Sequence, residues 1–278
     1  MRLNRYLAAA GLGSRRACET IITAGRVQLN GRPVRELATT IAPGDAVKVD
    51  GRNVAAQETY YLLLNKPPGV VSSASDERGR QTIFDLLPPG LPRLFHVGRL
   101  DRESEGLILL TNDGDLAQKL THPRHEVEKD YEVTLNKAFD PADVPKLIKG
   151  VFIPVETPGN PAPGAGQRRP AEDGPRKPAN DTALRHVRAR ASAVKQVAPR
   201  KVLITLRQGL KRQVRLMLYE FGYEVETLRR VRMGTITLGR LLPGRWRELL
   251  PKEIASLTAA FAPKTSSRPA SGGGHQRA

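Results

Sequence analysis

Residues 97–114 of the chain read VGRLDRESEGLILLTNDG. The aliphatic run Leu107–Leu110 is typical of a buried strand, and the stretch Asn112–Gly114 has the composition of a turn. A helical pattern then begins at Asp115. The charged segment 99–105 is therefore predicted to be a loop between two core elements, which is where catalytic groups are commonly placed.

Asp101 lies in this loop between Arg99 and Arg102. The positive charge of the two arginines would keep the carboxylate ionised and available as a nucleophile or a base. An aspartate in a loop is more often a turn former or a helix cap, so composition alone leaves both interpretations open.

The whole chain has 278 residues and a formal net charge of +17, with 45 Lys and Arg against 28 Asp and Glu. A chain of this length usually divides into two domains. The excess of positive charge favours a polyanionic partner, because each neutralised phosphate releases a condensed counterion. Nucleic acid is the leading candidate, since no basic amphipathic helix with a bulky apolar face indicates a membrane surface.

The composition also excludes several classes of protein. No run approaches the roughly 18–20 apolar residues of a membrane-spanning helix. The amino terminus lacks the apolar segment of a secretory signal, so a cytoplasmic protein is expected. Cys18 is the only cysteine, which excludes an internal disulfide and a multi-cysteine zinc site. A proline interrupts the pair His122 and His125, which is expected on a surface turn, and no metal site is predicted.

Residues 1–59 are predicted to form a small domain of two helices and a hairpin. Ser14 is placed to cap the second helix, and Asn30-Gly31 has the sequence of a hairpin turn. Arg15 and Arg16 open the second helix, where the helix dipole disfavours cations. Two solvated arginines would be the ordinary explanation, but in so basic a chain the free N–H groups of the helix start favour a phosphate site.

A second domain is predicted over residues 60–252, and residues 253–278 form a carboxyl-terminal extension. The segment at about 156–178 is rich in Pro, Gly and charge. It is predicted to be a flexible basic insertion, because it cannot bury enough apolar surface to offset the entropy of ordering. The segment either contacts RNA or is an inert surface loop, and the two interpretations carry equal weight. The end of the extension, from Lys264, is rich in Ser and Gly and is predicted to be disordered.

A basic helix is predicted after the strand-like run 203–206. Residues 213–221 carry an apolar stripe at helical spacing, and the basic side chains gather on the other face near the helix start. They are Lys211, Arg212 and Arg215. This is either a solvated basic face or a cluster that meets phosphates and, at Arg215, a carboxylate. Residues 207–247 contain ten Lys or Arg against three Glu, which favours a wall that faces nucleic acid.

The amino-terminal domain carries three short motifs, SRRA at 14–17, GRVQLNG at 25–31 and PGD at 43–45. With these motifs, residues 3–50 resemble the alpha-L motif, a small RNA-binding module that a ribosomal small-subunit protein shares with several RNA-modifying enzymes. Further motifs follow in order, KPPG at 66–69, GRLD with GLILLTNDG over 98–114, KDYEV at 129–133 and RQVR at 212–215. Residues 1–252 outside the insertion therefore resemble the ribosomal RNA pseudouridine synthases named after the small-subunit enzyme RsuA, a family that includes large-subunit members.

The resemblance implies an α+β protein, with the small helix-hairpin RNA-binding domain followed by a catalytic domain built on a mixed, largely antiparallel sheet. It implies the isomerisation of a uridine to pseudouridine in ribosomal RNA. In this reaction the N1–C1′ bond is cleaved, the base rotates and a C5–C1′ bond forms, without a metal or organic cofactor. The target uridine has to be flipped out of its stack to be reached.

The resemblance also implies roles for individual residues. Asp101 is the catalytic carboxylate, which either adds covalently or abstracts a sugar proton. Tyr131 stacks on the target base, and Arg215 pairs with the catalytic aspartate. Arg99 lies near the flipped nucleotide, and Lys66 shapes the cleft or meets a phosphate. The predicted RNA-binding residues are Arg15, Arg16, Lys66, Arg99, Lys211 and Arg212.

Two positions depart from the family pattern. Gln208 stands where the family usually has Glu, and Leu216 stands where it usually has Arg. The RQVR form at 212–215 favours the large-subunit branch. The expected partner is ribosomal RNA or a ribosomal subunit assembly intermediate, and nothing in the sequence requires more than a monomer. The alternative is a non-catalytic RNA-binding or ribosome-assembly factor with the same fold.

Overall fold

The computed structural model describes residues 1–156 and 184–261. Glu156 is the last residue of a strand, and the rest of the predicted insertion, 157–178, lies outside the described residues. The predicted tail from residue 264 lies outside them as well. No helix in the described ranges is long and apolar enough to cross a membrane.

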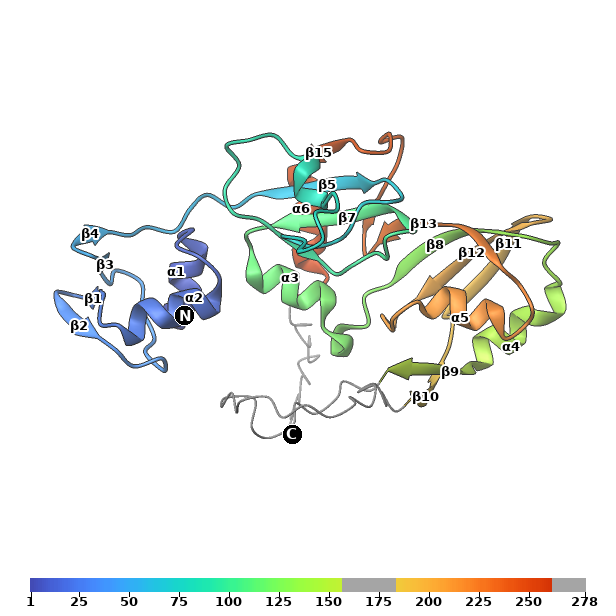
Figure 1. Cartoon of the computed structure of the whole chain (residues 1–278), viewed down its shortest axis with the longest axis horizontal. Coiled ribbons are helices and arrows are strands. Elements are labelled where there is room, and N and C mark those ends of the chain that lie inside the picture. The colour runs from blue at the N-terminus through green and yellow to red at the C-terminus, as the bar shows by residue number, and fades with distance from the viewer. Residues whose placement is uncertain (157–183, 262–278) are drawn as a thin grey trace, which may run out of the picture.

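The amino-terminal domain consists of two helices and a four-stranded antiparallel sheet of order β2-β1-β3-β4 (Figure 1). Ser14 caps the second helix, because its Oγ accepts a 3.1 Å hydrogen bond from the Ala17 N–H. Asn30 and Gly31 have φ angles of 51° and 81°, so the predicted hairpin turn is confirmed. The elements are α1 (Leu3–Ala9), α2 (Arg15–Thr23), β1 (Val27–Leu29), β2 (Arg32–Val34), β3 (Val47–Val49) and β4 (Arg52–Asn53).

The second domain is organised around a nine-stranded mixed sheet. Its main path is β11-β12-β8-β13-β7-β5-β15, with β14 paired to β13 and β6 paired to β7. Every pairing is antiparallel except that of β13 with β7, so the predicted α+β fold with a largely antiparallel sheet is confirmed. The strands are β5 (Tyr61–Lys66), β6 (Phe95–Val97), β7 (Glu105–Thr111), β8 (Lys129–Leu135), β11 (Ala193–Ala198), β12 (Lys201–Leu206), β13 (Val225–Met233), β14 (Ile236–Thr237) and β15 (Trp246–Glu248).

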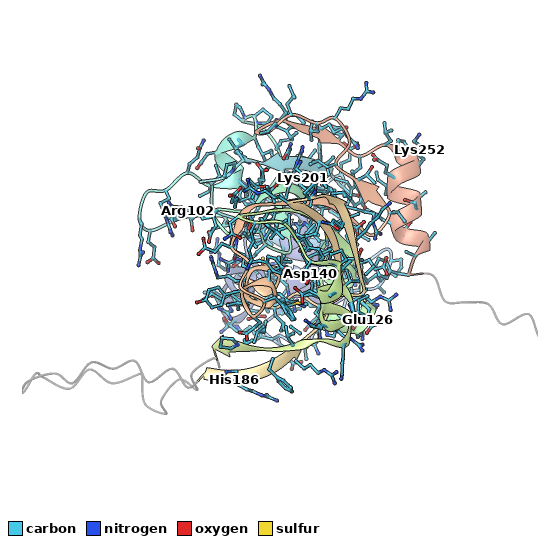
Figure 2. The ribbon with its side chains drawn as sticks, turned by 90° about the vertical axis from the view of Figure 1, so that its right-hand side faces the viewer. Arg102, Glu126, Asp140, His186, Lys201 and Lys252 are labelled. Atoms are coloured by element: carbon cyan, nitrogen blue, oxygen red, sulfur yellow. The ribbon has the colours of Figure 1, made fainter. Side chains whose placement is uncertain are left out.

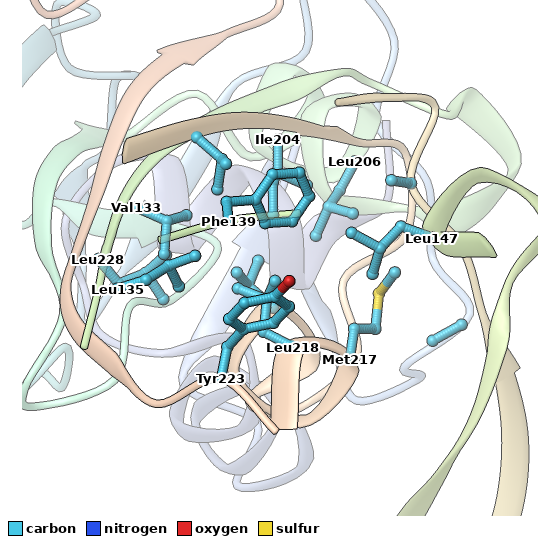
Figure 3. Packing of buried hydrophobic residues seen from close by; sticks show 14 of the residues in the cluster. Val133, Leu135, Phe139, Leu147, Ile204, Leu206, Met217, Leu218, Tyr223 and Leu228 are labelled. Carbon is cyan, nitrogen blue, oxygen red and sulfur yellow. The ribbon is translucent and has the colours of Figure 1, made fainter. Parts of the chain in front are cut away.

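Helices pack against this sheet over separate apolar clusters. The largest cluster lies between α5 and the strands β8, β12 and β13, where Phe139 and Tyr223 stack with ring centroids 5.4 Å apart (Figure 3). A second cluster joins α3 and α6 to β5 and β7, and a third lies on the other side of β5 and β7 against η1. The helices are η1 (Ile83–Leu86), α3 (Gly114–Thr121), η2 (Pro123–His125), η3 (Pro141–Asp143), α4 (Val144–Lys149), α5 (Gln213–Tyr219) and α6 (Pro251–Ala259).

Helix α6 spans the predicted boundary at residue 252. Leu257 of this helix is 1% exposed and lies in the same cluster as Leu107 and Leu116. The described part of the carboxyl-terminal extension therefore packs as part of the second domain.

Two further strands, β9 (Val151–Glu156) and β10 (Leu184–Ala189), pair as a separate antiparallel ribbon. Ile153 of β9 is buried in the same cluster as Met217 and Leu218 of α5, so the ribbon covers this helix. Figure 2 shows the ribbon apart from the large sheet, with His186 labelled on it.

A close approach of two backbones fixes the middle of the large sheet. Gly106 has a φ of 103°, and a Cβ atom at this position would lie 2.3 Å from the Arg230 carbonyl oxygen. Only glycine permits both this φ and this distance. The parallel register of Gly106 with Arg230 therefore brings the start of β7, where the Asp101 loop ends, directly beside β13.

Candidate active site

The loop that carries Asp101 connects β6 to β7 and is held at several points by the backbone. The Ser104 N–H donates a 3.1 Å hydrogen bond to the Asp101 carbonyl, and the Gly69 N–H donates a 2.8 Å bond to the Arg102 carbonyl. Ser72 Oγ donates to the Leu100 carbonyl at 2.9 Å. The loop is therefore a defined structure, from which the Asp101 side chain emerges half-buried.

Lys66 lies beneath this loop and is fully buried, with 0% exposure. Its ammonium donates hydrogen bonds to the carbonyl oxygens of Pro67 at 3.0 Å, Arg102 at 3.1 Å and Ser104 at 2.6 Å. Burial lowers the pKa of the ammonium to about 8, although Asp101 and two nearby glutamates act in the opposite direction. Lys66 therefore joins the end of β5 to both sides of the turn after Asp101.

This position corrects the predicted RNA-binding role of Lys66. An ammonium that is closed off from solvent and already bonded to three carbonyls cannot meet a phosphate. The other interpretation in the sequence analysis, that Lys66 shapes the cleft, fits the geometry.

Helix α5 also contacts the Asp101 loop. Arg212, at its amino-terminal end, has a φ of 54° and forms an ion pair with Glu103. The bond from Arg212 keeps the pKa of Glu103 below its usual value. Arg212 and Lys211 are both exposed, as their predicted RNA-binding role requires.

Arg215, in the first turn of α5, is half-buried. Its Nη1 donates a 2.8 Å hydrogen bond to the Val225 carbonyl, which fixes the side chain against the start of β13. Burial lowers the pKa of Arg215, while the charges of Glu103 and Asp101 raise it. Arg215 thus lies within electrostatic reach of Asp101, although no direct hydrogen bond joins these two described side chains.

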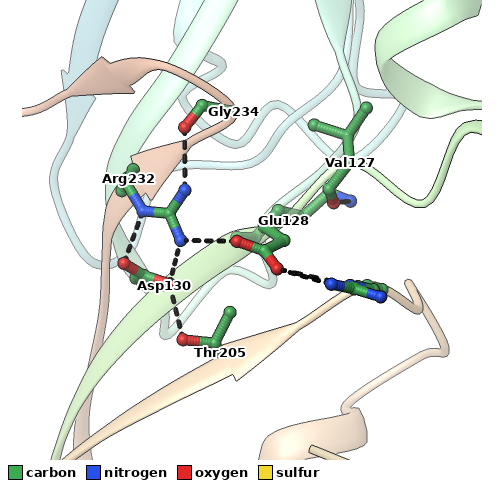
Figure 4. Close-up of polar contacts among 8 residues, drawn as sticks. Val127, Glu128, Asp130, Thr205, Arg232 and Gly234 are labelled. Carbon is green, nitrogen blue, oxygen red and sulfur yellow. Dashed lines mark hydrogen bonds and ion pairs between the residues drawn. The ribbon is translucent and has the colours of Figure 1, made fainter. Parts of the chain in front are cut away.

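Tyr131 lies at the centre of the sheet on β8, where it is opposite Ile204 of β12 and Arg230 of β13. It is half-buried and packs against the largest apolar cluster. The residue next to it, Asp130, accepts bonds from Arg232 Nε at 2.6 Å and from Thr205 Oγ1 at 2.8 Å (Figure 4). These bonds tie β8 to both neighbouring strands and hold Tyr131 in a rigid part of the sheet.

The same polar network engages some of the basic residues of 207–247, which are predicted to form a wall facing nucleic acid. Arg232 bonds Glu128, the residue before β8 (Figure 4), and Arg207 bonds the same carboxylate. Arg247 forms an ion pair with Glu253 of α6. Arg230 is 1% exposed. Several of these cations are therefore paired with acidic side chains or buried in the domain.

The remaining predicted RNA-binding residues are exposed. Arg99 lies at the start of the Asp101 loop, and its neighbour Arg102 projects from the loop in Figure 2. Arg15 and Arg16 lie in the first turn of α2 in the amino-terminal domain. Across the ranges that the structure describes, no group of three or more His, Cys, Asp or Glu side chains could hold a metal ion.

Sequence reasoning missed Ser72, Ser104 and Arg230. Ser104 lies inside the loop 99–105, and its place beside Asp101 was the signal that could have identified it. Arg230 stands in the run LRRVRM, where a basic residue is expected at the surface. Only the strand register turns it inward.

The comparisons with known proteins agree with this architecture. An RNA pseudouridylate synthase family model matches residues 60–220, and an S4 domain model matches residues 1–52. The chain is 41% identical to an uncharacterized RNA pseudouridine synthase of Mycobacterium leprae over 92% of both chains. It is 35% identical to the ribosomal large subunit pseudouridine synthase B of Bacillus subtilis, over 93% of this chain and 96% of that protein.

Two further matches extend the comparison. The dual-specificity RNA pseudouridine synthase of Escherichia coli is 33% identical over 98% of this chain and 86% of its own length. A crystal structure of a pseudouridylate synthase superposes with a TM-score of 0.59 at 26% identity, over 92% of this chain and 99% of that one. The chain therefore belongs to the family of RNA pseudouridine synthases, which are isomerases, and the resemblance found in the sequence is confirmed.

The depressed pKa of Lys66 predicts a pH-dependent contribution to stability. The pKa is about 8 in the folded protein against 10.5 as the usual value, so between these limits the unfolded chain binds the proton that the folded chain has released. The free energy of unfolding of the wild type, minus that of Lys66→Met, should therefore rise from pH 8 to pH 10 by at most about 1.4 kcal/mol per pH unit. Denaturant unfolding at several pH values measures this difference. A difference that stays constant or falls with pH would contradict the lowered pKa of Lys66.

Proposed function

We propose that the protein isomerises a specific uridine to pseudouridine in ribosomal RNA, with large-subunit RNA favoured as the substrate. The observation that carries the proposal is the Asp101 loop, which the buried Lys66 fixes through its carbonyl oxygens and which lies within electrostatic reach of Arg215. The large-subunit preference is supported by the name of the Bacillus subtilis relative and by the RQVR form of residues 212–215.

In this proposal Asp101 is the catalytic carboxylate. Arg215 places a positive charge within electrostatic reach of this carboxylate. Both addition to the sugar and abstraction of a sugar proton use a carboxylate in its ionised form. Tyr131 offers a flat ring, held by the sheet, on which the uracil ring stacks. The isomerisation needs a group that promotes cleavage of the N1–C1′ bond and a surface that retains the base while it rotates.

RNA binding is shared between the two domains. Arg15 and Arg16 meet phosphates at the start of α2, while Lys211 and Arg212 meet them beside the cleft. The exposed Arg99 takes the place that the flipped nucleotide leaves. The partner is ribosomal RNA or a subunit assembly intermediate, bound by a monomer in the cytoplasm.

We place the division between the domains near residue 59. The two family models support it, because one ends at residue 52 and the other begins at residue 60. The catalytic domain then extends through α6, since Leu257 is buried in its core. The S4 domain of residues 1–59 supplies RNA affinity to the domain that carries Asp101.

The alternative of a non-catalytic binding factor rests on the departures at Gln208 and Leu216. Gln208 Oε1 accepts bonds from the Arg190 N–H at 3.2 Å and from Gln213 Nε2 at 3.1 Å, so it builds the loop before α5. Leu216 packs against the largest apolar cluster. Both departures therefore have a structural role and leave Asp101, Tyr131 and Arg215 in place.

Asp101→Asn should abolish isomerisation, because the amide keeps the shape of the carboxylate and loses its charge. We expect the rate of tritium release from C5-labelled uridine in ribosomal RNA transcripts to fall at least about 1000-fold. RNA affinity should change less than about threefold, because many cations share the binding. The exposed Glu248→Gln on β15 is the matched control and should keep full activity. Full tritium release by Asp101→Asn would contradict the catalytic assignment.

Arg15→Glu combined with Arg16→Glu should weaken RNA binding and flatten its salt dependence. Each lost phosphate contact lowers the slope of log affinity against log salt by roughly 0.7–0.9. The control is Arg32→Glu with Arg52→Glu, which makes the same charge change at exposed positions of the same domain. Equal slopes for the two double variants, measured by fluorescence anisotropy from 50 to 300 mM salt, would reject a phosphate site at α2.

A further inference from the structure

Three buried polar groups without partners gather around the Asp101 loop. Over residues 1–156 and 184–261, four buried side-chain polar atoms have no hydrogen-bond partner. One belongs to Asn4 in the S4 domain, and the others are Ser104 Oγ, Arg215 Nε and Arg230 Nη2. A buried donor without an acceptor is costly, so such atoms are rare in folded proteins. Their concentration at this loop indicates a polar site that is completed by another molecule.

Arg230 has the most unusual setting of the three. It is 1% exposed, and its Nε donates a 2.7 Å hydrogen bond to the Leu107 carbonyl on β7. The ion pairs of the described residues do not include it, although Arg232 two positions away pairs with Glu128 and Asp130. Burial, together with the charge of Arg230, lowers the pKa of Lys129 to about 8. The guanidinium charge is therefore felt by its neighbours and is not neutralised by a carboxylate.

The sheet places this cation beside the residue proposed to hold the base. Tyr131 and Arg230 are directly opposed on β8 and β13. Opposed residues of an antiparallel pair project from the same face with their Cβ atoms about 5 Å apart. The bond to Leu107 directs the guanidinium toward β7, the strand that follows the Asp101 loop. Arg230 therefore lies on β13, between Tyr131 on β8 and the strand β7 that follows the loop. Figure 1 shows this order of β8, β13 and β7.

On the basis of the proposed function, we propose that Arg230 and Ser104 form a subsite for the uracil ring of the flipped uridine, and that Arg230 stabilises the negative charge that develops on the base. Arg230 Nη2 and Ser104 Oγ are both shielded from solvent in the RNA-free protein. The subsite opens when the base enters beside Tyr131. The Ser104 hydroxyl adds one hydrogen bond to the same ring.

The charge follows from the reaction. When the N1–C1′ bond breaks, its electron pair leaves with the uracil, and the negative charge spreads over N1 and the carbonyl oxygens O2 and O4. The charge is consumed when C5 bonds to C1′, which gives up whatever bond it formed after N1 left. The C5 proton is then lost to solvent and N1 takes up a proton, so the product is an isomer of the substrate. A fixed guanidinium without a carboxylate partner is suited to this transient anion, because its charge is already oriented and needs no reorganisation.

Single-turnover kinetics on the ribosomal RNA transcript that the wild type converts test this inference. Arg230→Gln should lower the rate constant about 100- to 1000-fold while the RNA dissociation constant stays within about twofold. Arg230→Lys should recover part of the rate, because it keeps the charge. Arg229→Gln is the matched control, since it lies on the same strand, projects from the other face and should stay within about threefold of the wild type.

A substrate with a different target base tests whether Arg230 stabilises charge or only supports the structure. Fluorine at C5 withdraws electrons and makes the base a better leaving group, so 5-fluorouridine at the target position should shrink the Arg230→Gln defect at least tenfold. Loss of fluorouridine is measured after nuclease digestion. If Arg230→Gln does not fold, Arg230→Lys carries the same comparison.

Equal defects with both bases, or an Arg230→Gln rate equal to that of Arg229→Gln, would overturn this inference alone. A wild type that converts no transcript would overturn the proposed function and this inference with it.

Discussion

The buried ammonium of Lys66 is the constraint on which the site depends. It bonds three carbonyl oxygens, two of them in the turn that follows Asp101, and it lies at the end of β5, beside β7. A carboxylate that acts on one bond of a flipped nucleotide, as we propose for Asp101, has to be placed within about 0.5 Å. Hydrogen bonds from the buried Lys66 ammonium to backbone carbonyl oxygens hold the loop in place without adding another exposed charge near Asp101.

The protein uses its positive charge in two different ways. Exposed arginines, such as Arg15 and Arg16 on α2, are available to phosphates. Around the Asp101 loop, Arg212 is paired with Glu103, whereas Arg215 and Arg230 are half-buried or buried and keep an N–H group without a partner. Only part of the positive charge behind the net value of +17 is therefore available to attract RNA, because some of the cations lie in the interior of the catalytic domain.

Local structure was largely predictable from the sequence. Leu107–Leu110 is aliphatic on both faces and forms a central strand, Ser14 caps its helix, and Asn30-Gly31 makes its turn, because each depends on neighbouring residues only. Pairing over long distances was not predictable. Arg232 bonds Asp130, 102 residues earlier, and the parallel contact of β7 with β13 depends on the close approach at Gly106. Lys66 and Arg230 are buried by strand register, against the general tendency of their residue types.

The central claim is that this chain makes a pseudouridine in ribosomal RNA through the carboxylate of Asp101. The most direct measurement maps every pseudouridine in ribosomal RNA from cells that lack the gene, and from the same cells that express the wild type or Asp101→Asn at equal levels. The account predicts that one large-subunit pseudouridine is absent without the gene, returns with the wild type and stays absent with Asp101→Asn. An unchanged pseudouridine map in cells that lack the gene would contradict it.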